Sequence, residues 1–340
     1  MGRQYDWRLC VVFALWLGGV AYACWSVGFT FFDAVEKSDF AIFWLSGKLA
    51  WTNPATAYDP VAFAAFALKE TGIARAALPY PPHFLLLAAP FGLLSFVPAF
   101  LVWNGLSAAL FAWAAKPFMV RLPLPLAFLT PAACVSLALG QTGLLIGALW
   151  LLAFRRHGWA VGLLTLKPHI GFLSAFTLNG RRFLLASLTA IGALGLAALF
   201  FPSALAAYPA AFANHFSRLE TGHYAIWNFM VVTPQQGYGI VGWAAFAIAA
   251  ILMLRRRFDV FTAATATFLI APYGLHYDLT VACLGMGLGM IDERRPWALA
   301  ALTFGFLVPF IVILGTWFAP PLLLAALFAQ VTEIKERSGG

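Results

Sequence analysis

Residues 155–182 read RRHGWAVGLLTLKPHIGFLSAFTLNGRR, an apolar segment with a pair of arginines at each end and one lysine near its middle. Basic residues of membrane proteins gather in cytoplasmic loops. If both arginine pairs are cytoplasmic, the segment must turn around near Lys167-Pro168, which leaves two limbs of about ten residues each. A helix needs about 20 residues to cross the hydrocarbon core. We therefore predict short, re-entrant helices beside a water-filled cavity, where broken helices are tolerated at membrane depth.

The composition of the whole chain indicates a lipid setting. Of the 340 residues, 62% are hydrophobic and 10% are charged, against about 25% charged residues in ordinary soluble domains. The mean hydropathy is +0.86. We predict an all-α integral membrane protein, a polytopic helical bundle forming a single transmembrane domain over residues 1–340 with roughly ten to twelve membrane helices. The composition excludes a disordered chain, a secreted disulfide scaffold and a nucleic-acid-binding domain.

Basic residues cluster at the ends of the apolar stretches and hold 15 of the 21 lysines and arginines. The clusters are Arg3 with Arg8, Lys116 with Arg121, Arg155-Arg156-His157, Arg181-Arg182, Arg255-Arg256-Arg257, Arg294-Arg295, and Lys335 with Arg337. Placing all of them in the cytoplasm satisfies the positive-inside rule. The net charge of +8 and the pI of 9.5 then need no anionic partner. The N-terminus is expected to be cytoplasmic, with residues 9–32 as an uncleaved signal anchor.

The cysteines give little functional information. Cys10, Cys24, Cys134 and Cys283 lie in apolar runs without C-x-x-C spacing. They are expected to be small buried hydrophobes, with neither a disulfide nor a zinc site.

A first outer loop is predicted at residues 33–82 and a second at residues 202–237. In the first, which carries Asp33, Glu36 and Asp39, a carboxylate can act as a general base that takes a proton from an attacking hydroxyl; the alternative is a solvated loop acid. The aromatic stretch from Phe40 to Trp44 is expected to form an amphipathic helix at the membrane interface. Asp59-Pro60 predicts the start of a surface helix that runs to Lys69.

Lys167 is the most informative polar residue, because a lysine at membrane depth is costly unless it meets water or an anion. We expect it to bind phosphate or carboxylate; the alternative is a lysine that snorkels to the interface. His169 can share the same ligand. Gln141 can donate to a polar head group or cap the helix that follows. Tyr80, within Pro79-Tyr80-Pro81-Pro82, either stiffens the loop or faces a ligand.

A second polar cluster, Tyr273-Gly-Leu-His276-Tyr277-Asp278, lies between apolar spans. His276 and Asp278 can bind a metal or transfer protons. A third metal ligand at useful spacing is absent locally, which disfavours a metal site. No cofactor is expected. His215 and His223 in the second outer loop are expected to be exposed. No Walker A loop, no G-x-G-x-x-G after a strand and no H-E-x-x-H helix occurs, which disfavours soluble nucleotide chemistry.

Several short motifs, taken in order, resemble glycosyltransferase family 87, a family of bacterial integral-membrane transferases of the GT-C type. The motifs are Ser38-Asp39-Phe40 with Phe43-Trp44, Tyr58-Asp59-Pro60, Tyr80-Pro81-Pro82, Gly140-Gln141 and Leu166-Lys167-Pro168. The resemblance covers about residues 38–180. The family includes the mycobacterial polyprenol-phosphate-mannose-dependent mannosyltransferases.

The resemblance implies an inverting transfer of a sugar from a polyprenyl-monophosphate donor to a lipid, glycan or protein acceptor. The reaction would take place on the periplasmic face of the bacterial inner membrane, without a metal. Asp39 matches the family's base, and Lys167 suits the donor phosphate, with Gln141 or His276 assisting. His169 departs from the family, where glutamine is more usual.

Two other classes remain open. A lipid-linked-sugar flippase or small-molecule transporter would share the basic inner loops and the polar cavity. It would also need polar residues on the cytoplasmic half, whereas those here fall on one side. A structural membrane subunit would leave Lys167 and Asp39 unexplained.

Overall fold

The computed structural model describes residues 38–220 and 230–332, together with residues 14, 17, 18 and 21. The rest of the predicted signal anchor at residues 9–32, the beginning of the first outer loop and the basic tail beyond residue 332 lie outside the described residues. So do Cys10, Cys24 and His223, and the His215 side chain. Within the described part the chain is helical, apart from one isolated antiparallel bridge between Val231 and Leu275.

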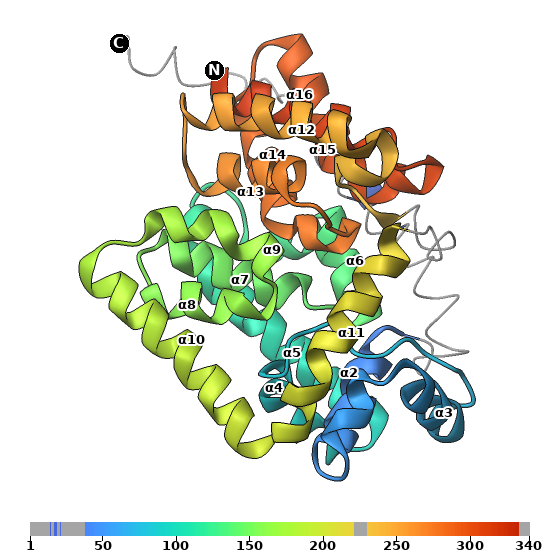
Figure 1. Ribbon diagram of the computed structural model, residues 1–340. Coiled ribbons are helices and arrows are strands. Elements are labelled where there is room, and N and C mark those ends of the chain that lie inside the picture. Colours follow the sequence, from blue (N-terminus) through green and yellow to red (C-terminus); the bar gives the residue numbers. More distant parts are fainter. Residues whose placement is uncertain (1–13, 15–16, 19–20, 22–37, 221–229, 333–340) are drawn as a thin grey trace.

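The α-helices share strongly apolar sequences and are connected by short loops or turns of 3-10 helix (Figure 1). They are α2 (Phe40–Ala50), α3 (Pro60–Thr71), α4 (Phe84–Gly92), α5 (Phe96–Ala115), α6 (Pro131–Leu139), α7 (Gly143–Phe154), α8 (Gly158–Leu163), α9 (Pro168–Gly171), α10 (Gly180–Phe200), α11 (Pro202–Glu220), α12 (Pro234–Leu254), α13 (Val260–Ile270), α14 (Thr280–Asp292), α15 (Pro296–Ile311) and α16 (Ala319–Thr332). The 3-10 helices are η2 (Pro54–Tyr58), η3 (Lys116–Phe118), η4 (Leu124–Leu129), η5 (Leu164–Leu166), η6 (Phe172–Thr177), η8 (His276–Leu279) and η9 (Val312–Leu314).

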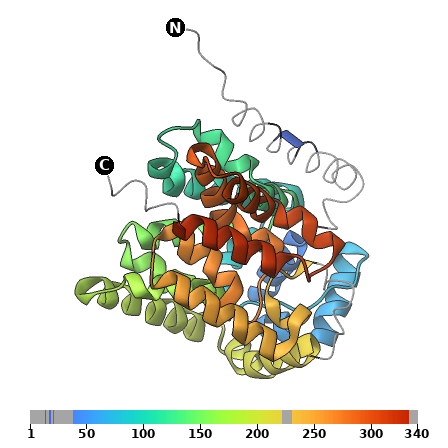
Figure 2. The ribbon, with the colours of Figure 1, turned by 90° about the horizontal axis from the view of Figure 1, so that it is seen from above.

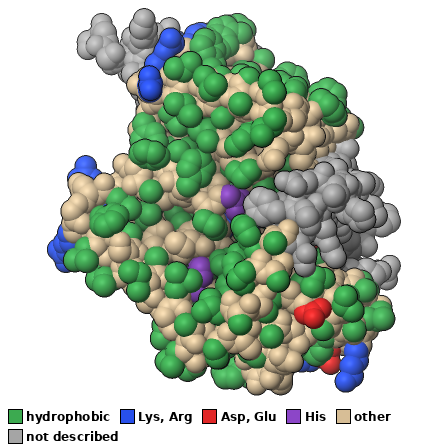
Figure 3. All heavy atoms as spheres, viewed as in Figure 1, with side chains coloured by type: hydrophobic (Ala, Val, Ile, Leu, Met, Phe, Trp, Pro, Cys, Tyr) green, Lys and Arg blue, Asp and Glu red, His purple; other side chains and the backbone are tan. Residues whose placement is uncertain are grey.

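Three described helices are long and apolar enough to cross a bilayer: Phe96–Phe118, Gly180–Phe200 and Pro234–Leu254. The second of these, α10, lies along one edge of the molecule, and only two small residues on it are buried. Phe183, Leu188 and Ile191 are all more than half exposed. Hydrophobic side chains are spread over the whole described face in Figure 3, and the few charged ones lie near its edges, as expected where the solvent is lipid. The structure agrees with an all-α membrane protein; ten to twelve membrane helices stay a prediction.

The segment predicted to be re-entrant consists of short helices. Helix α8 has 6 residues and α9 has 4. Lys167 interrupts them with a non-helical backbone (φ −143°, ψ 69°), and Pro168 begins α9. The two ends of the segment meet, because a Cβ atom on Gly158 would lie 2.4 Å from the carbonyl oxygen of Arg182. A re-entrant path requires that the two ends of the segment lie close together, as they do here. The side of the bilayer on which they lie stays a prediction.

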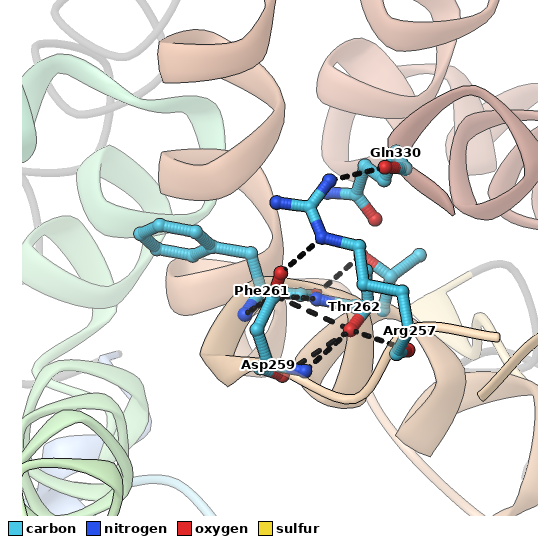
Figure 4. Close-up of polar contacts among 6 residues, drawn as sticks. Arg257, Asp259, Phe261, Thr262 and Gln330 are labelled. Atoms are coloured by element: carbon cyan, nitrogen blue, oxygen red, sulfur yellow. Dashed lines mark hydrogen bonds and ion pairs between the residues drawn. The ribbon is translucent and has the colours of Figure 1, made fainter. Parts of the chain in front are cut away.

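Helices α12, α13, α15 and α16 pack against one another (Figure 2). Figure 4 shows the polar contacts where α13 begins and α16 ends. The Asp259 carboxylate accepts hydrogen bonds from the backbone N–H groups of Phe261 and Thr262, which caps α13. Arg257 pairs with Asp259 and donates to the backbone carbonyl of Gln330. The Arg255-Arg256-Arg257 cluster is thereby fixed at this end of the helices.

Other basic clusters lie at the same end. Arg121 on the loop after α5 pairs with Asp292, the last residue of α14, at 2.5 Å. Arg155, just after α7, donates to the carbonyl of Trp113 near the end of α5, at 3.1 Å. Arg295 donates to the hydroxyl of Thr332 at the end of α16. These contacts bring clusters from distant parts of the sequence together, as a common cytoplasmic face requires.

Helices α7, α13 and α14 pack together and each carries a basic cluster near one end. The polar segments at their other ends are Gln141-Thr142, Tyr273 and His276-Tyr277-Asp278. The helices have 12, 11 and 13 residues, so the two ends are about 16–20 Å apart at 1.5 Å per residue. The predicted site residues therefore lie opposite the basic clusters.

The prediction of an interfacial helix after Asp39 is wrong. Phe40 and Leu45 of α2 are fully buried and Phe43 is nearly so, because this helix is apolar apart from Ser46 and Lys48 and packs inside the bundle. It lies so close to α4 that a Cβ atom on Gly47 would be 2.3 Å from a backbone oxygen of that helix. The surface helix predicted after Asp59 is confirmed as α3, which Asp59 caps.

Candidate active site

A cavity of about 210 Å³ opens between the loop before α4, the segment around Lys167, helix α11 and the loop before α14. Its wall is largely aromatic and apolar, and it also includes the basic side chains of Lys167 and His169. The aromatic residues that line it are Tyr58, Tyr80, Tyr208, Phe212, Tyr273 and Tyr277. An apolar, aromatic pocket with a few convergent polar groups is typical of a small-molecule site.

Lys167 meets an anion from the chain itself. Its Nζ lies 2.7 Å from Oδ1 of Asp278, and the two side chains are 5% and 0% exposed. The rings of Tyr277 and Tyr80 flank the ammonium group at 5.0 and 5.5 Å from their centroids. The sequence predicted an anion beside Lys167, and the structure supplies Asp278 as that anion. Binding of a donor phosphate by Lys167 stays a prediction.

Asp39 is held by Gln141, whose Nε2 donates to Oδ2 of Asp39 at 2.7 Å. Gly140 ends α6 in the left-handed conformation (φ +62°), and a Cβ atom there would lie 2.6 Å from Cβ of Phe40. This close approach of two chain segments brings Gln141 to Asp39. Gln141 does not cap α7, because the N-cap residue is Thr142; that alternative is wrong.

Burial raises the pKa of the Asp39 carboxyl, while the hydrogen bond from Gln141 and the charge of Arg75 lower it. Arg75 comes from the loop after α3, and its Nη1 donates to the backbone carbonyl of Ser38 at 3.1 Å. The carboxylate form of Asp39 thus depends on two neighbours that counteract the cost of burial.

The two halves of the site are connected through adjacent residues. Gln141 holds Asp39, while the hydroxyl of its neighbour Thr142 lies 2.6 Å from the hydroxyl of Tyr80. Lys167 donates to that same Tyr80 hydroxyl at 3.5 Å. Tyr80 lines the cavity, whereas Asp39 and Gln141 are not among its lining residues. The Asp39 carboxylate and the buried Lys167 ammonium group therefore belong to two sets of polar contacts, which the neighbouring residues Gln141 and Thr142 join.

The family model of glycosyltransferase family 87 matches residues 78–273, which is more than half of the chain. The chain belongs to glycosyltransferase family 87. The family predicted from the short motifs is confirmed, and the matched region of this family 87 protein contains Tyr80, Gln141, Lys167 and His169. Asp39 precedes it, and Asp278 follows it. Neither a curated protein nor a solved structure matches the chain.

The two histidines predicted for the site of this family 87 protein, His169 and His276, differ in their position relative to the cavity. His169 lines the cavity, with its ring 6.0 Å from that of Tyr273. His276 is buried and is not among the residues that line the cavity. Burial lowers the pKa of His276 to about 4, so the imidazole is neutral near pH 7. A neutral, enclosed ring offers no positive charge to a phosphate, and its predicted role is untested.

Neither the position of Arg75 near Asp39 nor the ion pair of Asp278 with Lys167 was predicted from the sequence. Arg75 is one of six basic residues that fall outside the predicted cytoplasmic clusters. That exception to the charge pattern could have indicated Arg75 as a candidate site residue. Asp278 was considered only together with His276, as a metal ligand or for proton transfer, and not as a partner of Lys167. Among the described residues, no three His, Cys, Asp or Glu side chains gather as a metal site would need; metal independence stays a prediction.

Proposed function

We propose that this family 87 glycosyltransferase transfers a sugar from a polyprenyl-monophosphate donor to a hydroxyl acceptor, with inversion and with Asp39 as general base. The observation that carries the proposal is that Asp39 and Lys167 are connected through Gln141, Thr142 and Tyr80, opposite the basic clusters. The positive-inside rule puts that side in the periplasm of a bacterium, if the clusters are cytoplasmic. The enzyme would act in the inner membrane.

The chemistry requires little beyond these two groups. The acceptor hydroxyl gives its proton to Asp39 while its oxygen forms a bond to the anomeric carbon of the sugar. The bond between that carbon and the phosphate oxygen breaks, and the electron pair leaves with the phosphate. Lys167 holds the charge that develops on the leaving group. A single displacement of this kind inverts the anomeric configuration.

The residues that line the cavity suit a polyprenyl-phosphate sugar as donor. The aromatic residues of the cavity offer flat apolar faces to a sugar ring, and the apolar surface of the helices keeps the polyprenyl chain in lipid. Lys167 supplies the positive charge for which other transferases use a divalent ion. The acceptor can be a lipid, a glycan or a protein.

The test is turnover by purified protein in liposomes supplied with a panel of polyprenyl-phosphate sugars and an envelope extract as acceptor. Lys167→Gln should weaken donor binding, because a charged partner of the phosphate is lost. Lys48→Gln is the matched control, since Lys48 forms a partly exposed ion pair with Glu70 away from the cavity. Absence of transfer with every donor, together with movement of sugar-lipid across the same liposomes, would replace this proposal by a flippase.

A further inference from the structure

A carboxylate lies directly behind the lysine of the cavity wall. Lys167 lines the cavity, whereas Asp278 is not among its lining residues and its side chain is fully buried. Oδ1 of Asp278 accepts from Lys167, and Oδ2 accepts from the backbone N–H of Leu275 at 3.3 Å. Asp278 is therefore fixed by two hydrogen bonds, and it holds the ammonium group at the edge of the cavity.

This arrangement makes the anion site nearly neutral before any ligand arrives. The other groups in contact with the ammonium are the Tyr80 hydroxyl and the Tyr80 and Tyr277 rings, which carry no formal charge. Within reach of Lys167, its charge is therefore balanced by that of Asp278. An incoming phosphate is attracted by the lysine and repelled by the aspartate just behind it.

The repulsion increases with the charge of the ligand. A polyprenyl-phosphate sugar is a phosphodiester with one negative charge. The polyprenyl phosphate that remains after transfer is a monoester, and its charge near pH 7 is about −1.5 to −2. A bare lysine would hold this product more tightly than the donor, which would slow its release.

We propose that Asp278 is a positioning residue that offsets the charge of Lys167 and so prevents the doubly charged product from being retained. The proposal rests on the proposed function of the same site. Asp278 thereby sets how strongly the site distinguishes a phosphomonoester from a phosphodiester. This explains why a chain that needs a cation at the cavity also buries a partner for it.

The test measures binding to the purified protein in lipid nanodiscs, with farnesyl phosphate as the monoester probe and farnesyl methyl phosphate as the diester probe. Asp278→Asn keeps the size of the side chain and removes its charge. It should tighten farnesyl phosphate binding about tenfold and farnesyl methyl phosphate binding about threefold at most. Adding Lys167→Gln to this variant should abolish the gain. Asp292→Asn, at the other end of α14, is the matched control and should change neither affinity.

A gain in affinity is a result that mere structural damage would not produce. Unchanged or weaker farnesyl phosphate binding by folded Asp278→Asn protein would overturn the proposal. If that variant does not fold, the native protein still decides: a preference for the monoester below about threefold supports the proposal, and one above about tenfold overturns it. Binding of neither probe by the native protein would instead refute the donor class in the proposed function.

Discussion

Replacing Gln141 by methionine tests whether Asp39 works as a carboxylate, because it removes a hydrogen-bond donor with little change in side-chain volume. The Gln141 amide nitrogen lies 2.7 Å from Oδ2 of Asp39. A hydrogen bond to a charged group contributes about 1.5–3 kcal/mol. Each 1.36 kcal/mol corresponds to a tenfold change in rate, so kcat/KM near neutral pH should fall about 10- to 100-fold.

The pH dependence gives the sharper result. Burial raises the pKa of Asp39, and the Gln141 hydrogen bond is the larger of the two influences that lower it. Without that bond the pKa rises further, so the carboxyl group takes up its proton at a higher pH. A general base acts only in its unprotonated form. The acidic limb of the kcat/KM profile should therefore shift to higher pH, and alkaline buffer should restore part of the activity.

The assay is initial-rate sugar transfer in liposomes across a range of pH. Ser136→Ala is the matched control, because the buried Ser136 hydroxyl donates to the backbone carbonyl of Tyr277 at 3.1 Å and not to the Asp39 carboxylate. Its acidic limb should stay where the native one lies. An equal loss of kcat/KM at every pH for Gln141→Met, with an unmoved acidic limb, would refute the reasoning.

Gly47→Ala should lower the melting temperature, because its Cβ atom would lie 2.3 Å from the backbone oxygen of Ala88 and overpacking costs about 1–3 kcal/mol. Gly105→Ala, which meets open space, should leave that temperature nearly unchanged, and equal melting of both variants would contradict the close contact of α2 with α4. Arg156→Cys and Arg182→Cys should react with an impermeant thiol reagent from the same side of the membrane; labelling from opposite sides would exclude the re-entrant path. EDTA should leave turnover unchanged, and a loss that a divalent ion restores would contradict metal independence.

The local features of the fold could be predicted because they depend on neighbours in the sequence. Pro168 cannot continue a helix from Lys167, and the arginine pairs at 155–156 and 181–182 limit the length between them. Asp59 before Pro60 is a common helix start, because Asp is favoured at the N-cap and Pro at the first helical position. These signals were sufficient for the short pieces around Lys167 and for α3.

The contacts that make the site could not be predicted in this way. Asp278 lies 111 positions from Lys167 and Gln141 lies 102 from Asp39, so only the folded chain pairs them. The order of the motifs indicated that Asp39, Gln141 and Lys167 belong to one site. It did not indicate which of these side chains are in contact. Helix α2 was misplaced because aromatic residues suit both an interface and a core, and local sequence does not distinguish the two.

The most direct test of the central claim is single-turnover transfer from donor-loaded enzyme, native against Asp39→Asn. The asparagine can still accept the hydrogen bond from Gln141, so the site keeps its shape and donor affinity should change less than about threefold. The rate of sugar transfer should fall about 10²- to 10⁴-fold, which is the usual contribution of a general base. Transfer at the native rate, or a loss explained entirely by weaker donor binding, would contradict the assignment of Asp39 as the base.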